Sequence, residues 1–365
     1  MIRILQEVHS MDPGGMETQI MKIYREIDKT RIQFDFLVHV EKEGFYDEEI
    51  KKMGGHIFYT QRYNPLKLFK YKKELRSFFK SHHYDIVIGH SDMGMFFLRE
   101  AYKMNVSTRI AYSHNAESHF NLKFFFMKFQ RFFLQKYATH FLSVSQKAAL
   151  FLFGKKRTKS DVRIVNNGLD TQKFTYRNDV RTIIRDNLNV DDNDLVFGHV
   201  GRFMPQKNHS FLIDVFEQLC VLTKNRAKLV LIGDGYLKKD VERTIARKGL
   251  ENSVVIKSNV SNVNEYLNGF DCFILPSLWE GFPNVIVESL CNGLPSVFST
   301  NVTSEAVLTD YAIQLELKLS AKEWALKILE FINNKPHYDA SVEIIEKGFD
   351  IHEIARWYEH WYESL

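Results

Sequence analysis

The residues best suited to chemistry lie in one stretch, where two glutamates stand eight residues apart around a helix start. Glu280 sits in a turn, and Glu288 sits in a run that is otherwise apolar. A carboxylate in a packed helix costs several kcal/mol unless it is paired or hydrogen-bonded. Glu288 therefore needs a partner, and ligand hydroxyls could serve. A solvated helix edge would be the better explanation for a single glutamate, but the spaced pair favours a site that binds hydroxyl groups.

The stretch around these glutamates predicts a strand, a turn and a helix. The apolar run 272–276 indicates a buried strand. Pro283 suits the first helical position, because its missing N–H would have no helical acceptor there anyway. We expect the helix to run to about Asn292 and to end at Gly293. The free N–H groups around Gly281 to Val285 would then point at the carboxyl end of a sheet, where they bind anions, phosphate above all.

A second group of residues carries the positive charge that such an anion needs. Arg202 follows the end of a predicted strand near Gly201, and Lys207 precedes a helix that begins near Asn208, a favourable N-cap residue. Arginine can bind a diphosphate with two parallel hydrogen bonds, whereas lysine supplies a point charge. A lysine in a surface turn is usually only solvated. Two cations around one strand-to-helix turn favour a phosphate site.

Two weaker signals lie in the first half of the chain. His114 follows a predicted strand and could hydrogen-bond a reacting group, although a histidine at a strand end is more often structural. Gly14 and Gly15 follow the first strand, and we expect them to adopt positive φ and to let a ligand approach the backbone. Glu17 should lie in the first turn of the next helix. A plain tight turn is the better explanation of the two glycines.

Short strands that alternate with helices must position these residues, a pattern typical of parallel sheets covered on both faces. The predicted strands of the first half are 2–8, 34–40, 56–60, 85–90, 109–113, 140–144 and 162–166. Those of the second half are 196–200, 228–232, 253–256, 272–275, 296–299 and 312–315. The turn at 166–170 leads into a linker. We therefore expect three parts: a domain at 1–168, a second at 169–348, and a terminal helix at 349–365.

Length and composition fit this organisation. The 365 residues suggest two domains. Cys220, Cys272 and Cys291 lie in apolar contexts without metal-binding spacing, which indicates buried thiols in a reducing compartment. A strand pattern begins at Ile2, and no apolar run reaches spanning length. We expect a cytoplasmic protein that is peripheral on the inner face of the cytoplasmic membrane.

The net charge of +4 hides an asymmetry between the two halves. Residues 1–160 hold 27 Lys+Arg against 16 Asp+Glu, a net of +11, whereas the remainder has a net of −7. The excess is concentrated in 62–80 and 119–137, which are also aromatic. Such segments suit a membrane interface rich in anionic lipid. A core-facing aromatic stripe with a solvated basic face explains them equally well. No nucleic-acid-binding motif accompanies the charge, so we expect no nucleic-acid partner.

These pieces, in this order, resemble the family 4 glycosyltransferases of the GT-B fold, and bacterial capsular and exopolysaccharide enzymes in particular. The matching stretches extend from residue 14 to residue 295 and are GGMET, SHNAES, NNGLDTQKF, GHVGRFMPQKN, LVLIGDG and EGFPNVIVESLCNGLP. The spaced glutamate pair together with GRFMPQKN is specific to the family, whereas the isolated glycine turns are not. The resemblance implies two Rossmann-like, doubly wound α/β domains that face a cleft. It also implies that the last helix crosses back to the first domain.

The resemblance implies a retaining transfer of a hexose or N-acetylhexosamine from a nucleotide sugar, which we expect to be UDP-linked, to a lipid-linked or oligosaccharide acceptor. Arg202 and Lys207 would bind the donor diphosphate, Glu288 the ribose hydroxyls and Glu280 hydroxyls of the donor sugar. His114 would contact the sugar near the reacting centre. The remaining donor contacts implied by the family are Gly15, Gly201, Gly233, Gly281, Phe282, Pro283, Asn284 and Val285.

No cofactor is implied, and no metal is predicted. Asp192 and Asp194 match an Asp-x-Asp pattern but precede the amino end of a strand, so we expect them at the surface. The family usually has glycine where Lys257, Ser258 and Asn259 stand, which leaves the base of the donor open. Two other functions stay open: a nucleotide-sugar epimerase on the same scaffold, and a non-catalytic partner subunit of a transferase complex.

Overall fold

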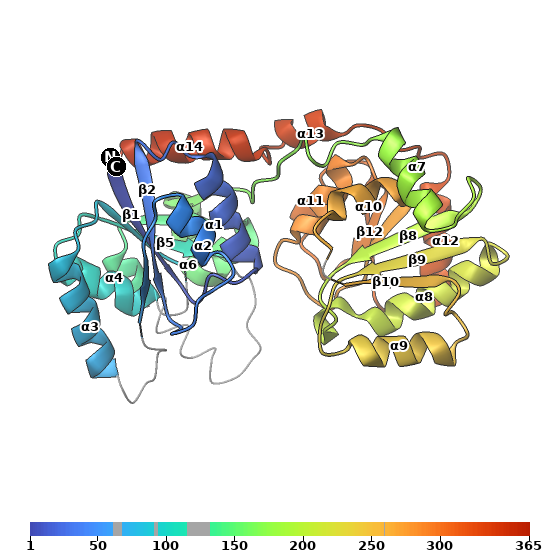
Figure 1. The fold of residues 1–365 in the computed structure, drawn as a ribbon, viewed down its shortest axis with the longest axis horizontal. Helices are drawn as coiled ribbons and strands as arrows, with labels where there is room; N and C mark the ends of the chain where they lie inside the picture. Colours follow the sequence, from blue (N-terminus) through green and yellow to red (C-terminus); the bar gives the residue numbers. More distant parts are fainter. Residues whose placement is uncertain (61–67, 91–93, 115–131, 259) are drawn as a thin grey trace. The chain divides into compact units, whose positions relative to one another are not determined.

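The structure, a computed structural model, describes residues 1–60, 68–90, 94–114, 132–258 and 260–365. The chain divides into two compact units. Unit 1 consists of Met1–Gly168 and Ile351–Leu365, and unit 2 of Leu169–Asp350. Each unit is a parallel sheet with helices on both faces (Figure 1).

Unit 1 contains a seven-stranded sheet in the order β3-β2-β1-β4-β5-β6-β7, and every neighbouring pair is parallel. Its strands are β1 (Ile2–Val8), β2 (Ile32–Val38), β3 (Ile57–Tyr59), β4 (Ile86–Gly89), β5 (Thr108–Ser113), β6 (His140–Ser143) and β7 (Val162–Ile164). Its helices are α1 (Gly15–Glu26), α2 (Asp47–Lys52), α3 (Leu68–Ser81), α4 (Gly94–Lys103), α6 (Gln146–Ser160) and α14 (Ile351–Glu363), and residues 132–137 are also helical.

Two hydrophobic clusters cover the two faces of this sheet. One joins α1 and α14 to β1 and β2 through residues such as Tyr24, Phe34 and Tyr358. The other joins α3 and α4 to the opposite face through residues such as Leu75 and Phe97. Strands buried on both faces must be apolar almost throughout, and all seven residues of β2 are buried. This burial explains why the strands of unit 1 could be located from apolar runs.

Unit 2 contains a six-stranded parallel sheet in the order β10-β9-β8-β11-β12-β13. Its strands are β8 (Leu195–Val200), β9 (Ala227–Ile232), β10 (Val254–Lys257), β11 (Cys272–Leu275), β12 (Ser296–Ser299) and β13 (Ala312–Leu315). Its helices are α7 (Asn178–Asn187), α8 (His209–Leu222), α9 (Lys238–Arg247), α10 (Val263–Gly269), α11 (Asn284–Cys291), α12 (Ala321–Ile332) and α13 (Ser341–Glu346), with 3-10 turns η2 (Pro205–Lys207) and η3 (Ser304–Ala306).

The helices of unit 2 also divide between two faces. The hydrophobic cluster on one face includes Ile184 of α7, Leu267 of α10 and Leu290 of α11. The cluster on the other face includes Phe216 of α8 and Trp324 of α12. Both sheets are therefore doubly wound, as predicted, and each places the carboxyl ends of its strands along one edge.

All thirteen predicted strands are present, with ends that differ by at most two residues. The three cysteines are free and buried, as expected. The last helix also lies where it was expected, because α14 belongs to unit 1 and packs beside α1 (Figure 1).

The first basic, aromatic segment shows features of both of its interpretations. On α3, Tyr71, Leu75 and Phe79 are buried, which accounts for most of its apolar stripe. Phe69 is 90% exposed beside the exposed Lys70. Of the segment at 62–80, residues 62–67 lie outside the described residues, as do residues 119–131 of the other. No helix in the described part of the chain is both long and apolar enough to cross a membrane.

Candidate functional site

The carboxyl ends of β8 and β11 are neighbours at the centre of the unit 2 sheet. The two strands pair in parallel, with Phe197 opposite Cys272. The strand order reverses here, because β9 and β10 lie on one side of β8, whereas β12 and β13 lie on the other side of β11. Ligands of open α/β sheets bind at such a switch point, in the crevice beyond the strand ends. The two loops that meet there carry Lys207 and Glu280.

Hydrogen bonds hold these two loops together. The backbone N–H of Leu278 donates to the carbonyl of Gln206 at 2.8 Å, and the Gln206 amide donates to the Trp279 carbonyl at 3.0 Å. The Asn208 amide donates to the Pro276 carbonyl at 3.2 Å. We call these contacts between residues 206–208 and residues 276–280 the loop clamp. The clamp fixes the positions of the charged side chains on both loops.

Lys207 and Glu280 form an ion pair within the loop clamp. The Nζ atom of Lys207 lies 2.6 Å from Oε1 of Glu280, and the two side chains are only 15% and 10% exposed. Oε1 also accepts a hydrogen bond from the Ser277 hydroxyl at 2.9 Å, and Oε2 accepts one from the Gln206 amide at 3.2 Å. A carboxylate offers about four acceptor positions, and an ammonium group has three N–H donors. The Glu280 carboxylate can therefore still accept a hydrogen bond from a ligand, and the Lys207 ammonium group can still donate one.

The helix that follows Glu280 begins one residue later than predicted. α11 starts at Asn284, and Pro283 is its N-cap, with an extended backbone. The Pro283 carbonyl accepts from the Ile286 N–H at 3.0 Å, so the proline belongs to the first turn without being its first helical residue. Gly281 and Phe282 are half-buried before it, as is Val285 after it. The start of α11 thus lies at the carboxyl edge, as an anion-binding helix start requires.

Glu288 and Arg202 lie at this edge with different exposure. Glu288 is half-buried on α11, within a helix whose Ile286, Val287 and Leu290 are fully buried. Arg202 is exposed just beyond β8. The structure thus brings Lys207 and Glu280 into direct contact. Arg202 lies in the segment between β8 and Lys207, and Glu288 lies on the helix that follows Glu280.

Asn208 is the N-cap of α8, as predicted, but its side chain does not cap the helix. Its backbone is left-handed, and its amide joins the loop clamp instead. A 3-10 turn precedes it and ends at Lys207. This turn directs the lysine toward Glu280 rather than along the helix.

The loop after β9 supports the loop that leads from β8 to Lys207. The carbonyl of Ile232, at the end of β9, accepts from the Gly201 N–H at 2.9 Å, and the Asp234 carbonyl accepts from the Phe203 N–H at 2.9 Å. A Cβ atom on Gly233 would lie 2.1 Å from the Gly201 carbonyl oxygen. Gly233 is therefore required for the close approach of two backbones.

In unit 1, the switch point lies between β1 and β4, and Gly15 follows β1. Gly14 is the N-cap of α1 with an extended backbone, and Gly15 is the first helical residue. The expectation of positive φ at these two glycines is wrong, since neither is among the residues with positive φ. A Cβ atom on Gly15 would meet no described atom within 4 Å. Glu17 lies in the first turn, as predicted.

His114 follows β5 at the same edge, where it contacts a second histidine. Its Nε2 atom lies 2.8 Å from Nδ1 of His90, the residue after β4. A separate buried pair lies beside them: His39 Nε2 is 2.5 Å from Glu7 Oε1, and the Glu7 carboxylate also accepts from the His90 N–H at 3.2 Å. Four neighbouring strands thus each place a polar residue at the carboxyl edge of unit 1.

Comparison with known proteins matches both units to one enzyme class. Residues 13–173 match the family described as "Glycosyltransferase Family 4", and residues 180–348 match "Glycosyl transferases group 1". EpsF of Bacillus subtilis (strain 168), named as a glycosyltransferase, is 31% identical over 331 residues, which cover 88% of this chain and 84% of EpsF. The chain belongs to the family 4 glycosyltransferases.

Two further relatives of this glycosyltransferase bear more specific names. The capsular polysaccharide biosynthesis glycosyltransferase CapH of Staphylococcus aureus is 25% identical over 347 residues, 92% of each chain. The UDP-Gal:alpha-D-GlcNAc-diphosphoundecaprenol alpha-1,3-galactosyltransferase of Escherichia coli is 29% identical over 142 residues, 38% of this chain and 36% of that enzyme.

A solved structure shares the fold of the glycosyltransferase over its full length. Anabaena HepE, determined in complex with UDP, superposes with a TM-score of 0.83 at 18% identity, and the match covers 100% of both chains. The two units are accordingly the two Rossmann-like domains of a GT-B fold.

Several residues at the two edges of the glycosyltransferase were not anticipated from its sequence. In unit 2 these are Ser277 and Gln206, which hold Glu280. In unit 1 they include Glu7 and His90. The signal for Glu7 was available, because a charge near the end of an apolar strand must be buried and therefore paired. Ser277 and Gln206 carried no comparable signal.

The Asp-x-Asp pattern lies away from the carboxyl edge of unit 2, in the turn before β8. Asp194 accepts from the Asp191 N–H at 3.0 Å and pairs with Arg226 at 3.3 Å. Among the residues that the structure describes, no group of three His, Cys, Asp or Glu side chains is arranged to hold a metal ion.

The segment at which the chain departs from the usual glycine of the family follows β10. There the Ser258 hydroxyl accepts a hydrogen bond from Lys238 Nζ at 2.8 Å, and Asn259 lies outside the described residues.

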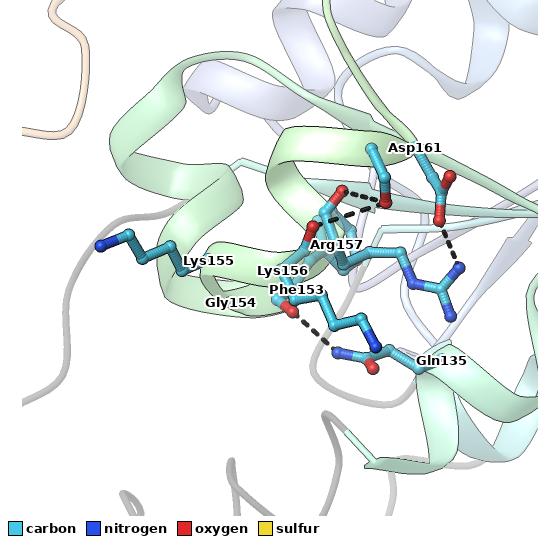
Figure 2. Close-up of a pocket in the computed structure, with 8 residues that line it drawn as sticks. Gln135, Phe153, Gly154, Lys155, Lys156, Arg157 and Asp161 are labelled. Carbon is cyan, nitrogen blue, oxygen red and sulfur yellow. Dashed lines mark hydrogen bonds and ion pairs between the residues drawn. The ribbon is translucent and has the colours of Figure 1, made fainter.

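A pocket of about 570 Å³ lies elsewhere in the glycosyltransferase, where α6 kinks at Gly154 (Figure 2). Figure 2 shows the Gln135 amide donating to the Phe153 carbonyl, at 2.7 Å, and Arg157 pairing with Asp161, at 2.6 Å. α6 begins after β6 and ends just before β7. Its C-terminal part, which lines the pocket, therefore lies at the amino edge of the unit 1 sheet. The pocket is therefore separate from the strand ends that carry His114.

Two histidines pack beneath Lys207 in unit 2. The ring centroids of His199 and His209 lie 4.8 Å apart, and His209 stacks on Phe203 at 4.4 Å. Burial and the nearby Lys207 lower the pKa of His209 to about 4. Burial, followed by His209, holds the pKa of His199 well below its usual range. Both rings are therefore neutral at pH 7.

We expect the substitution His209→Phe to make the enzyme less sensitive to acid. Between pH 6.5 and pH 4 the unfolded chain protonates this histidine, whereas the folded chain does not, so native stability falls by up to about 1.4 kcal/mol per pH unit. Phenylalanine keeps the stacking and removes this dependence. The free energy of unfolding of the variant, relative to that of the native enzyme, should rise by about 2 kcal/mol from pH 7.5 to pH 4.5. Urea unfolding of the full chain measures this difference.

His360→Phe, at an exposed position in unit 1, is the control. An advantage that does not change with pH would contradict the expectation.

Proposed function

We propose that the enzyme transfers a hexose or N-acetylhexosamine from a UDP-sugar, with retention of configuration, to a lipid-linked oligosaccharide acceptor in cell-surface polysaccharide biosynthesis. The observation that carries the proposal is the loop clamp, which holds Lys207 and Glu280 together beside the start of α11 at the switch point. Cleavage of a sugar–phosphate bond develops negative charge on the diphosphate. A fixed cation and the N–H groups of a helix start at that position stabilise the charge in the transition state.

The proposal assigns a role to each of the residues implied by the family. In the proposal, Lys207 and Arg202 bind the diphosphate, and Glu280 uses its remaining acceptor capacity for a hydroxyl of the donor sugar. Glu288 binds the ribose hydroxyls. In unit 1, Gly15 and His114 contact the substrate, and a Cβ atom on Gly15 would meet no described atom within 4 Å.

Names of relatives support the chemical classes in the proposal. HepE was solved with UDP, and the galactosyltransferase from Escherichia coli is named for a UDP-sugar and a diphosphoundecaprenol acceptor. The name of CapH refers to capsular polysaccharide biosynthesis.

We further propose that unit 1 contacts an anionic membrane surface. Phe69 and Phe132 are 90% and 68% exposed, and exposed lysines such as Lys70 and Lys136 lie near them in the sequence. Exposed aromatic side chains beside lysines suit a lipid interface. Equal sedimentation of the enzyme with neutral and with anionic vesicles would rule out this part of the proposal.

The nucleotide is tested by thermal stability of the purified enzyme with UDP, GDP and their sugar conjugates. A ligand at 100 times its dissociation constant should stabilise the enzyme by about 2.7 kcal/mol. We expect UDP to raise the melting temperature of the enzyme. With a UDP-sugar, we expect a product to form only when a lipid-linked acceptor is supplied. A changed sugar without any acceptor would indicate an epimerase instead.

We expect Glu288→Ala to weaken UDP binding about 10- to 100-fold, because hydrogen bonds to a charged group contribute about 1.5–3 kcal/mol. Titration calorimetry with UDP measures this change directly. Glu242→Ala, at an exposed position of α9, is the matched control and should bind UDP normally. An unchanged affinity in Glu288→Ala would refute the ribose role.

A further inference from the structure

The contact between His114 and His90 belongs to a longer hydrogen-bonded chain inside unit 1. His90 Nε2 lies 2.7 Å from Oε1 of Gln6, and His90 Nδ1 lies 2.8 Å from Nε2 of His114. We call Gln6, His90 and His114 the histidine chain. It begins in β1 and passes through the residue after β4 to the residue after β5. These strands are neighbours, and β1 and β4 flank the switch point of unit 1.

The orientation of the Gln6 amide gives this chain its direction. The carbonyl oxygen of Gln6, Oε1, faces Nε2 of His90 at 2.7 Å. The Gln6 side chain also lies beside Tyr362 of α14, whose pKa is raised well above its usual value by burial and by Tyr112.

The positions of the ring protons follow from this orientation. An amide oxygen only accepts, so His90 carries its proton on Nε2 and donates to Gln6. A neutral imidazole has one N–H, so Nδ1 of His90 is an acceptor. His114 must therefore donate from Nε2, which leaves its own Nδ1 without a proton. Burial lowers the pKa of His114 to about 3, and burial also keeps the pKa of His90 well below its usual range, so neither ring is charged at neutral pH.

The same helix also holds the ring that packs on His114. The Tyr358 hydroxyl donates to the Tyr112 hydroxyl at 2.9 Å. The Tyr112 ring lies 4.1 Å from the His114 ring, centroid to centroid. α14 thus contacts both the start of the histidine chain, through Tyr362, and the aromatic ring beside its end, through Tyr358. Such outer contacts commonly set the orientation and tautomer of a histidine.

We infer that Gln6 and His90, supported by α14, are positioning residues that hold His114 with its proton on Nε2, so that its Nδ1 accepts a hydrogen bond from a sugar hydroxyl. The inference rests on the proposed function for the contact between His114 and the sugar. It adds the chemical class of the group that is recognised. An unprotonated Nδ1 accepts from a hydroxyl and repels a carboxylate or phosphate oxygen, so the sugar is neutral at this point.

The proton positions can be measured on the full chain without any substrate. Protein labelled with ¹⁵N in the histidine rings distinguishes protonated from unprotonated ring nitrogens by NMR at pH 7.5. His114→Asn identifies the signals of His114 by their loss. We expect Nε2 of His114 to carry the proton and Nδ1 to be bare. A proton on Nδ1 of His114 in the native enzyme would overturn the inference, whatever the variants do.

Two variants of His90 test the positioning role. In His90→Asn, the amide oxygen can take the place of the Nδ1 acceptor, so His114 should keep its tautomer and most of its kcat/KM. In His90→Phe the acceptor is lost, so the two tautomers of His114 should mix and kcat/KM should fall about 10-fold. An unchanged His114 tautomer in His90→Phe would overturn the role of His90.

The same measurements separate this inference from the proposed function. If Nδ1 of His114 is bare but His114→Asn turns over UDP-sugar normally, the histidine chain is supported and the contact of His114 with the sugar is refuted. If no nucleotide stabilises the enzyme, the proposed function fails, whereas the NMR result still decides the inference.

Discussion

We expect Lys207→Met to lower turnover at least about 100-fold and to destabilise unit 2 at the same time. The loss of turnover follows if Lys207 stabilises charge on the leaving diphosphate, since removal of one such group typically costs a factor of 100 to 1,000, about 2.7–4 kcal/mol. The loss of stability has a separate cause. The Glu280 side chain, which is only 10% exposed, would lose the cation beside it. Removal of one partner of a buried pair costs about 3–5 kcal/mol.

A second substitution separates these two effects. Glu280→Gln in the Lys207→Met background removes the unpaired charge, and the amide can still accept from Ser277, which lies 2.9 Å from Oε1. We expect the double variant to recover stability to within about 1 kcal/mol of the native enzyme, because the charges are then balanced. Turnover should stay low, since no cation faces the diphosphate. Unfolding by urea and initial rates with a UDP-sugar measure the two properties independently.

The outcome distinguishes a chemical role of Lys207 from a structural one. Recovery of turnover together with stability would mean that Lys207 only supports the loop clamp. Near-normal turnover in the single variant would remove the lysine from the mechanism altogether. The single variant Glu280→Gln, which keeps the cation, shows how much turnover depends on the carboxylate alone.

The strands of both domains could be predicted because parallel strands are buried on both faces. The strand Cys272–Leu275 has no exposed residue, and it was predicted with the same bounds. A short apolar run between turn residues is a reliable signal for such a strand. The helix after it was also predicted, apart from the shift of its start from Pro283 to Asn284.

Contacts between loops could not be predicted in the same way. Lys207 and Glu280 were each assigned to a ligand, but their 2.6 Å contact depends on the pairing of β8 with β11. The two residues are separated by 73 positions, and nothing in the local sequence specifies which loop ends meet. Asn208 shows the same limit, because its type fitted a helix cap, whereas the neighbouring loop offered its amide a different acceptor.

In unit 1, the sequence contained a signal that apolar runs alone do not show. Gln6 and Glu7 interrupt β1 near its carboxyl end, where the strand is fully buried. Polar groups in that position must find partners, and the structure provides them in His90 and His39. Only the strand order shows that these partners come from neighbouring strands.

The second large effect is expected for Gly233→Ala, which should destabilise unit 2 by about 3 kcal/mol and lower turnover about 100-fold. Gly233 has a φ of +149°, and a Cβ atom there would lie 2.1 Å from the Gly201 carbonyl oxygen. Backbone atoms must move, and the strain of the backbone angle adds about 1–3 kcal/mol. The displaced loop leads directly to Lys207, and a shift of about 1 Å in a positioning group can cost a factor of 100 in rate.

Gly249→Ala is the matched control, because it separates backbone strain from the collision. Gly249 also has positive φ, at +65°, but a Cβ atom there would meet no described atom within 4 Å. We expect this variant to lose about 1 kcal/mol of stability and no turnover. Thermal unfolding and initial rates compare the two variants. If Gly233→Ala behaves like its control, the close approach of Gly233 to Gly201 does not hold Lys207 in place, and the position of the lysine must depend on the loop clamp alone.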